Sequence, residues 1–491
     1  MELFYRSTRN ENVMLTASEA ILKGLSDEGG LFVPEYIPKL PVPLADLAGM
    51  DYQETAYVVM KQFLTDFTEE ELRGCIRAAY DDKFDNEEIA PIAKVEGVYY
   101  LELFHGPTIA FKDMALSILP HLMTTAARKH HVTDEIVILT ATSGDTGKAA
   151  LAGFADVEGT RIIVFYPKGG VSDVQRLQMV TQKGNNTAVV AIHGNFDEAQ
   201  SGVKKMFEDE KLKEELQKAG FRFSSANSIN IGRLVPQIVY DVHAYGCLLK
   251  HEAVNVVVPT GNFGNILAAY FAKQMGVPIA KLICASNENK VLFDFFETGT
   301  YDKNREFILT ESPSMDILIS SNLERLIYLI SGRNEAKNRE LMKELNENGR
   351  YGITGKMKAE LSDFAAGYAS ADEMKKAIRD TYENTGYVMD THTAVAAAVY
   401  EAYRRDSNDP AKTIIASTAS PYKFAESVLN AIRPGEYEGQ EGIALADELS
   451  RLSGTEIPKA VEEIRNAEIR HTRECDAQEM EAAVKEILGL R

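Results

Sequence analysis

The chain has 491 residues, of which 45% are apolar and 26% are charged, and its formal net charge is −20. This length predicts about two to four domains with a large apolar core, and the composition is ordinary for a globular protein. The negative charge disfavours nucleic acid and anionic membrane surfaces as partners, because both bind basic patches.

The cysteines lie far apart and form no CxxC pair; they are Cys75, Cys247, Cys284 and Cys475. This spacing fits a reducing compartment and offers no zinc site, and no histidine pair has metal-ligand spacing. Residues 1–6 lack the basic and apolar regions of a signal peptide, and no apolar stretch approaches the roughly 20 residues of a membrane span. We therefore expect a cytoplasmic protein without a bound metal.

Residues 1–95 predict a small, mainly helical unit. Residues 16–24 have helical spacing and end in a glycine, and residues 55–64 and 68–80 are amphipathic. No motif in this unit indicates chemistry, so we expect it to pack against the rest of the protein or to shape an entrance.

From residue 96 strands alternate with helices, which is the pattern of a parallel α/β sheet. Predicted strands occupy residues 98–104, 136–141, 161–166, 187–192, 254–259, 279–285 and 413–417. We assign residues 96–430 to this region, with a charged helical insertion at about 287–385 whose strands are absent or short and which is not a catalytic unit of its own. Residues 431–491 predict an acidic, then helical tail that docks on the surface. Ligands of such sheets bind at the carboxyl ends of the strands.

Lys112 lies between Phe111 and Asp113 at a strand–turn–helix junction, after the turn pair Gly106–Pro107. Partial burial beside an aromatic ring would lower the pKa of its ammonium group and free the amine as a nucleophile toward carbonyls. A solvated lysine in the first turn of a helix fits the same residues, so this stretch alone leaves both interpretations open.

Two polar turns follow buried strands. The first, residues 142–147, includes Ser143, Asp145 and Thr146, which can hold a carboxylate or phosphate or simply cap the next helix. The second turn consists of Gly261, Asn262, Phe263, Gly264 and Asn265. Its glycines let the backbone approach an anion at a helix N-terminus, which makes a phosphate cradle. It is neither a GxGxxG nor a Walker loop, and a plain strand-to-helix turn is its alternative.

Ser228 and Arg233 lie at the start of an otherwise apolar helix, where they can bind an anion, with the guanidinium of Arg233 as a forked donor. The alternative is that Ser228 caps the helix and Arg233 is a surface cation. His105 and His392 have no other histidine nearby in the sequence, and each can be a structural histidine without a role in the site. Together, a reactive lysine, a phosphate cradle and polar turns suit pyridoxal phosphate, whose aldehyde bonds to a lysine amine and whose phosphate needs such a cradle.

Four motifs, in this order along the chain, resemble threonine synthases of the enteric-bacterial and fungal branch; they occupy residues 104–113, 142–147, 227–233 and 261–265. Residues 29–34 resemble the N-terminal domain of that branch, and the resemblance extends to about residue 430. It implies a fold-type II pyridoxal-phosphate enzyme, similar to tryptophan synthase β, with parallel sheets flanked by helices, a small N-terminal domain and a helical insertion. The expected reaction is a lyase-type conversion of O-phospho-L-homoserine and water to L-threonine and phosphate, the last step of threonine biosynthesis.

The resemblance also implies roles for the site residues. Lys112 would hold pyridoxal 5'-phosphate as an internal aldimine and then shuttle protons, and Thr418 would face the pyridine nitrogen. Residues 261–265 would bind the cofactor phosphate, and the turn at residues 105–108 would shape the site. The carboxylate and phosphate of the substrate would be held by Ser143, Asp145, Thr146, Ser228 and Arg233.

The sequence departs from the family at Ser420 and Tyr422, where a histidine and an alanine are usual. This puts in question any role of that histidine in packing or substrate contact.

Two other functions fit parts of the pattern: another fold-type II lyase, such as a threonine or serine dehydratase, and a threonine-synthase-like protein that binds the cofactor without turnover. The branch is often monomeric, and no coiled-coil pattern argues against a monomer here.

Overall fold

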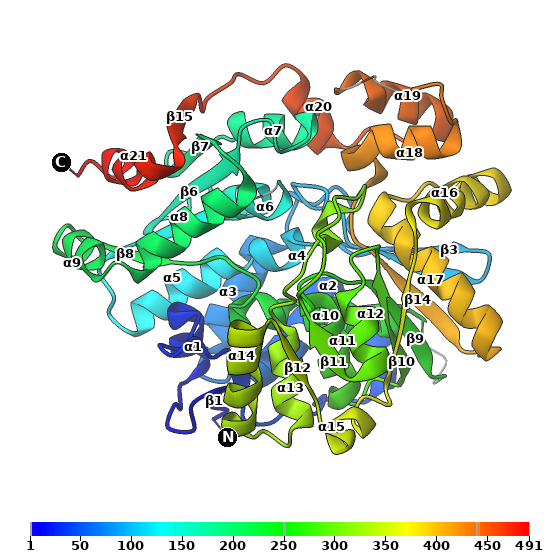
Figure 1. Ribbon diagram of the computed structural model, residues 1–491, viewed down its shortest axis with the longest axis horizontal. Coiled ribbons are helices and arrows are strands. Elements are labelled where there is room, and N and C mark those ends of the chain that lie inside the picture. Colours follow the sequence, from blue (N-terminus) through cyan, green and yellow to red (C-terminus); the bar gives the residue numbers. More distant parts are fainter. Residues whose placement is uncertain (1, 143, 249–251, 438–439, 441, 491) are drawn as a thin grey trace.

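The computed structural model of the protein describes residues 2–142, 144–248, 252–437, 440 and 442–490. Two sheets organise the chain (Figure 1). The first has the strand order β13 (Phe364–Tyr368), β10 (Ile279–Ser286), β9 (Val254–Pro259), β14 (Lys412–Ser417), β4 (Val98–Glu102) and β3 (Ile92–Val95). The second has the order β15 (Arg473–Asp476), β7 (Thr187–His193), β6 (Thr160–Pro167), β5 (Glu135–Ala141) and β8 (Phe221–Ser224). Neighbouring strands are parallel except β3 and β4.

The N-terminal segment forms the predicted helices, which are α1 (Ala17–Lys23), α2 (Tyr52–Phe63) and α3 (Glu69–Ala79), and a small antiparallel pair of β1 (Tyr5–Ser7) and β2 (Phe32–Pro34). A capping box between Thr16 and Glu19 starts α1, and Gly24 ends it with a φ of 69° that glycine adopts without strain. Helix α2 packs on α10 (Ile231–Leu248), and α1 packs on α5 (Leu119–Lys129). These helices therefore share a core with the α/β region.

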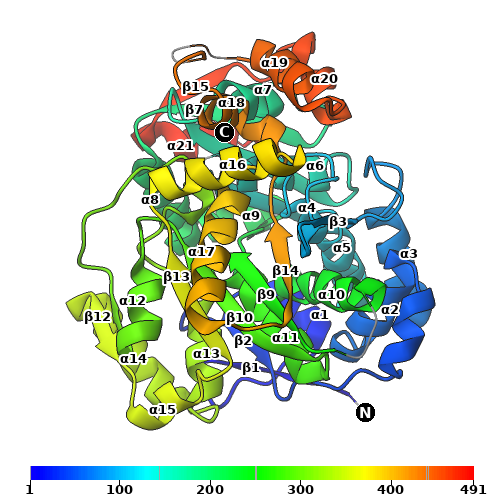
Figure 2. The ribbon, with the colours of Figure 1, turned by 90° about the vertical axis from the view of Figure 1, so that its right-hand side faces the viewer.

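Successive residues of the central strands enter different cores. In β9, Val256 and Val258 lie in the core that both sheets share with the N-terminal helices, whereas Val257 lies in the core under α17 (Thr391–Ser407). In β5, Ile138 lies in the shared core and Leu139 in the outer core of the second sheet. Figure 2 shows β9, β10 and β14 between α17 on one side and α10 and α11 (Gly264–Met275) on the other. Burial on both faces explains the continuous apolar runs of these strands.

The remaining helices connect the strands or cover the sheets. Along the chain they are α4 (Asp113–Leu116), α6 (Asp145–Phe154), α7 (Asp173–Val180), α8 (Phe196–Glu208), α9 (Glu210–Lys218), α12 (Val291–Thr298), α13 (Leu323–Ile330), α14 (Glu335–Asn348), α15 (Gly355–Ala359), α16 (Ala371–Thr385), α18 (Ala425–Ile432), α19 (Ala444–Ser453), α20 (Lys459–Arg465) and α21 (Met480–Ile487). In the part of the chain that the structure describes, no helix has both the length and the apolar character needed to cross a membrane.

Two segments contribute edge strands to the sheets, and only the tail differs from the expectation. The block at 287–385 is helical for the most part, and its short strand β13 pairs in parallel with β10 at a sheet edge. The tail does more than dock, because β15 pairs in parallel with β7 and extends the second sheet (red in Figure 1). Both are short edge strands that are stabilised by pairing with a neighbour, and β15 consists mostly of polar residues, so it shows no apolar run in the sequence.

Candidate active site

Lys112 lies where the segments after two neighbouring strands, β4 and β14, run side by side. The N–H of Phe111 donates to the carbonyl of Thr418 at 2.8 Å, and the N–H of Ser420 donates to the carbonyl of Ile109 at 3.0 Å. Helix α4 begins directly after Lys112. The Lys112 side chain is only 14% exposed, so its expected desolvation is present.

The Lys112 amine has two polar neighbours. Its Nζ donates to Ser314 Oγ at 3.3 Å and lies 3.8 Å from Asp145 Oδ2. Burial lowers the pKa of Lys112 to about 8; the Asp145 carboxylate opposes this shift, and the positive charges of Lys423 and Arg233 add to it. At pH 7 about a tenth of such an amine is neutral, far more than for a solvated lysine. Lys112 is therefore suited to attack a carbonyl carbon.

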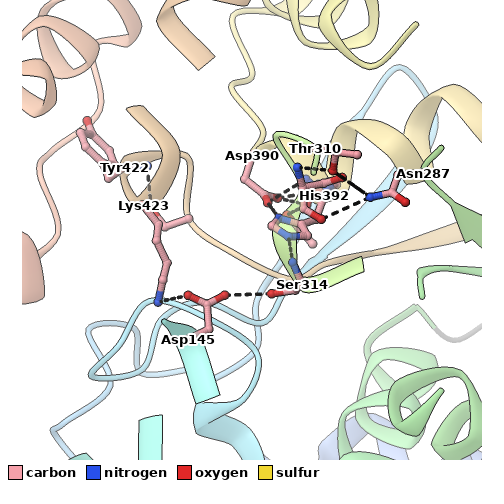
Figure 3. Close-up of polar contacts among 12 residues, drawn as sticks. Asp145, Asn287, Thr310, Ser314, Asp390, His392, Tyr422 and Lys423 are labelled. Carbon is pink, nitrogen blue, oxygen red and sulfur yellow. Dashed lines mark hydrogen bonds and ion pairs between the residues drawn. The ribbon is translucent and has the colours of Figure 1, made fainter. Parts of the chain in front are cut away.

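Asp145, the first residue of α6, is bonded through both carboxylate oxygens (Figure 3). Oδ1 lies 3.0 Å from Lys423 Nζ and accepts from Gln175 Nε2 at 2.9 Å, and Oδ2 accepts from Ser314 Oγ at 3.0 Å. Burial alone would raise the pKa of Asp145, but the ammonium groups of Lys423 and Lys112 hold it well below its usual range. A fixed carboxylate repels anions, so the position of Asp145 fits contact with Lys112 better than the expected contact with a substrate anion.

The rest of the turn after β5 largely bonds to itself. Thr142 Oγ1 accepts from the N–H of Gly144 at 3.0 Å and from that of Gly147 at 2.9 Å. Thr146 is half-buried, and its hydroxyl makes no hydrogen bond within the described ranges. Ser143, which the sequence also predicts as a substrate contact, lies outside the described residues.

The turn after β9 leaves polar groups unpaired. Asn265 is 6% exposed, yet neither its Oδ1 nor its Nδ2 has a hydrogen-bond partner among the residues described. Phe263 adopts a left-handed φ of 67° just before α11 begins at Gly264. A Cβ on Gly261 would lie 2.3 Å from the carbonyl oxygen of Ser314, so only glycine fits there. Free N–H groups at a helix N-terminus and an unpaired amide, close to a buried lysine, fit the phosphate and aldehyde of pyridoxal phosphate.

Arg233 is a buried cation without an anionic partner in the part of the chain that the structure describes. It is 3% exposed, and burial lowers its pKa to about 10. Its Nη1 donates to the carbonyl of Ala226 at 2.9 Å, while Nε has no partner among the described residues. Asn322 Nδ2 lies 3.5 Å from Ser228 Oγ and donates to the carbonyl of Asn262 at 3.0 Å, which connects Ser228 to the turn after β9. An uncompensated buried guanidinium group is chemically suited to bind an anion.

Comparison with known proteins agrees with this arrangement. Family models named threonine synthase N terminus, pyridoxal-phosphate dependent enzyme, and threonine synthase, C-terminal match residues 4–80, 86–418 and 393–475. A threonine synthase from Pseudomonas aeruginosa is 37% identical over 87% of this chain and 90% of its own length. This chain belongs to the threonine synthase family. The predicted resemblance is thereby confirmed.

Other members of the threonine synthase family extend the comparison. The crystal structure of pyridoxal-phosphate-bound threonine synthase from Brucella melitensis superposes on this structure with a TM-score of 0.88. The match covers 99% of each chain at 34% sequence identity. This match confirms the predicted fold-type II architecture. The human protein named threonine synthase-like 1 is 40% identical over 85% of this chain, and this chain spans 58% of the length of that relative.

The two residues that depart from the family pattern make local contacts. Ser420 Oγ accepts from the N–H of Tyr422 at 3.3 Å, and the Tyr422 hydroxyl donates to the carbonyl of Thr455 at 2.9 Å. Figure 3 shows the Tyr422 side chain directed away from Asp145, toward which the neighbouring Lys423 points. Tyr422 therefore attaches the C-terminal tail to the segment that carries Thr418, which is itself 5% exposed.

Sequence reasoning missed Ser314 and Lys423, and it left the role of His392 open. The N–H of Ser314 donates to His392 Nε2 at 3.1 Å, and His392 Nδ1 lies 2.8 Å from Asp390 Oδ2 (Figure 3). Because Nε2 accepts, Nδ1 carries the proton and donates to Asp390. The Asp390–His392 pair thus fixes the backbone of Ser314, whose hydroxyl contacts both Lys112 and Asp145. Ser314 belongs to the short η2 helix (Pro313–Met315) of the charged block, which carries no local signal of a site.

The His105 ring lies between two carboxylates, which fits a structural role. Its Nδ1 lies 2.6 Å from Asp85 Oδ1 and its Nε2 lies 3.0 Å from Glu102 Oε2. Burial disfavours the charged imidazole, but the two carboxylates raise its pKa to about 9. Of the turn at residues 105–108, Thr108 is connected to the site, because its carbonyl accepts from Lys423 Nζ at 2.9 Å.

Proposed function

We propose that this protein catalyses the conversion of O-phospho-L-homoserine and water to L-threonine and phosphate, the last step of threonine biosynthesis. The observation that carries the proposal is the presence, in one site, of a buried, partly neutral amine at Lys112 and a buried guanidinium at Arg233 that has no anionic partner among the described residues. The first suits the aldehyde of the cofactor, and the second suits an anionic group of the substrate.

The chain offers contacts for each part of pyridoxal phosphate. Lys112 would bond to its aldehyde carbon, residues 261–265 would hold its phosphate, and the Thr418 hydroxyl would face its pyridine nitrogen. The bound cofactor supplies an electron sink for the carbanion that forms when a proton leaves the substrate. Arg233, Ser228, Ser143 and Thr146 would hold the carboxylate and phosphate of the substrate.

Lys112 also serves as the base and acid of the reaction. Its pKa of about 8 lies close to neutral pH, so its amine accepts a proton from a substrate carbon and returns it at modest cost. Ser314 and Asp145 keep Nζ in place between these transfers. Burial of the amine limits its contact with bulk water, so a proton taken from the substrate remains on Nζ until it is returned.

Incubation of the purified protein with O-phospho-L-homoserine tests the proposal, with phosphate and threonine measured in parallel. We expect equal amounts of the two products. Phosphate with a keto acid in place of threonine would indicate a dehydratase-type lyase, and no phosphate at all would indicate a protein that binds the cofactor without turnover. Either result would refute the proposed reaction.

Arg233→Met tests the anion site. Loss of a charge-assisted hydrogen bond costs about 1.5–3 kcal/mol, so we expect KM for O-phosphohomoserine to rise roughly 10- to 100-fold. The exposed Arg222→Met is the matched control and should leave KM unchanged. Equal KM values for the two variants would exclude Arg233 from substrate binding.

We also propose that residues 1–95, 96–430 and 431–491 are the three units of the chain and that it acts as a cytoplasmic monomer without nucleic-acid or membrane partners. The net charge of −20 disfavours nucleic-acid and anionic membrane partners. The four free thiols support the cytoplasm, since thiols persist in reducing compartments. Light scattering after gel filtration should give the mass of one chain, and twice that mass would refute the monomer.

A further inference from the structure

Lys423 is a lysine whose side chain is fully buried beside the candidate site. Its side chain is 0% exposed, and its Nζ lies 3.0 Å from Asp145 Oδ1 and donates to the carbonyl of Thr108 at 2.9 Å. It belongs to the η3 turn (Pro421–Phe424) that follows β14. A buried lysine is costly unless it is paired, and Asp145 provides the paired carboxylate here.

Lys112 and Lys423 compete for the same carboxylate. The shorter contact of Asp145 goes to Lys423, at 3.0 Å, whereas Lys112 lies at 3.8 Å. The Asp145 oxygen nearest Lys112 also accepts from the Ser314 hydroxyl at 3.0 Å. Lys112 is thus left with a longer, shared contact to the carboxylate and donates to a neutral hydroxyl.

We propose that Lys423 is a positioning residue that engages Asp145 and thereby prevents Asp145 from fixing Lys112 as an ammonium ion. Lys112 then reacts with the aldehyde of pyridoxal phosphate near neutral pH. This inference rests on the proposed role of Lys112. It assigns to Lys423 an action through Asp145, without contact to the cofactor or the substrate.

Charged or titratable groups from several elements surround the two lysines. They are Asp145 on α6, Asp113 on α4, Arg233 on α10, His392 on α17 toward Asp145, and Lys148 on α6 toward Lys423 and Asp113. Loss of the Lys423 charge acts on Lys112 in one direction by two routes. It removes a like charge that faces Lys112, and it frees Asp145 to pair with Lys112 more closely. Both routes favour the protonated form of Lys112.

The test uses the full-length protein, freed of cofactor and mixed with pyridoxal phosphate at a series of pH values. A double bond forms between Nζ and the aldehyde carbon, and the aldehyde oxygen leaves as water with two protons from nitrogen. Only the neutral amine attacks, so the absorbance-monitored rate follows its fraction. Borohydride reduction and peptide mass spectrometry then locate the pyridoxyl group.

Lys423→Met should move the midpoint of the pH–rate profile upward by about one unit, which lowers the rate at pH 7 about tenfold. Lys423→Arg retains the charge and should keep the wild-type midpoint. The double variant Lys423→Met/Asp145→Asn should move the midpoint back down, because the freed carboxylate is gone. Both methionine variants lose the hydrogen bond to Thr108, so their difference isolates the charge of Asp145.

Equal midpoints for wild type and Lys423→Met would overturn the inference, as would equal midpoints for the single and double methionine variants. If Lys423→Met does not fold, Lys423→Gln, which retains a donor for Thr108, takes its place with the same expected shift. A pyridoxyl group elsewhere than on Lys112 in the wild type would overturn the proposed function itself. Labelling of Lys112 without a shift would overturn only the role of Lys423.

Discussion

Two strand-to-helix turns of similar composition meet at the candidate site, and their polar groups have opposite surroundings. After β5, Thr142 bonds two backbone N–H groups of its own turn, and Asp145 is bonded by Lys423, Gln175 and Ser314. After β9, the Asn265 amide is buried but has no hydrogen-bond partner among the residues that the structure describes. Thr142 and Asp145 of the first turn are therefore bonded by the protein itself, whereas Asn265 of the second turn is left without a bond among the described residues, as its proposed role in cofactor binding requires.

This difference has an energetic consequence. A buried hydrogen bond or ion pair that the protein forms with itself contributes to folding stability, and its loss costs the desolvation of the remaining partner. A buried amide without a partner has already lost its hydration in the ligand-free protein. A ligand that forms a hydrogen bond with this amide therefore gains binding free energy. Variants in the turn after β5 should therefore affect stability, and variants in the turn after β9 should affect cofactor binding.

Asp145→Ala should have the largest effect on stability. It leaves the buried Lys423 without its carboxylate, and breaking a buried pair in this way costs about 3–5 kcal/mol. Urea unfolding of the cofactor-free protein at pH 7 measures the loss. Because the folded-state pKa of Asp145 is depressed, its stabilisation is present above the unfolded pKa of about 4 and is lost as the pH falls further.

Asp447→Ala is the matched control for this experiment. Asp447 pairs with Arg465 through two contacts of 2.8 Å, but its side chain is 57% exposed. Surface pairs contribute only about 0–1 kcal/mol. Similar losses for Asp145→Ala and Asp447→Ala would remove the distinction between the buried and the exposed pair.

Thr142→Val tests the internal bonding of the first turn. Valine has nearly the shape of threonine but offers no acceptor to the N–H groups of Gly144 and Gly147. Leaving them unpaired should lower the free energy of unfolding by about 2 kcal/mol. Thr146→Val in the same turn, where the half-buried hydroxyl makes no hydrogen bond to the described residues, should change it by less than about 0.5 kcal/mol. The reverse ranking would show that Thr142 does not hold the turn.

The same contrast explains how much could be predicted from the sequence. Residues such as Lys112 and Asn265 follow a predicted strand and a glycine, and parallel strands bring their carboxyl ends to one edge, so local patterns indicated that they would meet. The central strands were predictable for a related reason, because burial on both faces requires continuous apolar runs.

Ser314 and Lys423 could not be found in that way. Ser314 lies in a charged block whose pattern indicates solvated helices, and its position depends on the backbone contact with His392, which is far away in the sequence. Lys423 looks like any lysine, since its burial and its contact with Asp145 arise only when β14 pairs beside β4. Pairing partners distant in sequence leave no periodic signal, which also hid β15.

Asn265→Ala should have the smallest effect on stability, and it probes the other turn. Without cofactor, removal of an unpaired amide should change the free energy of unfolding by less than about 1 kcal/mol. With cofactor, loss of one hydrogen bond of about 1–1.5 kcal/mol should weaken pyridoxal phosphate binding roughly 5- to 10-fold, as measured by fluorescence titration. Asn262→Ala, at an exposed side chain of the same turn, should leave the affinity nearly unchanged, because in the proposed site backbone N–H groups bind the phosphate there. A loss of stability without cofactor, and unchanged affinity, would mean that both turns are completed by the protein alone.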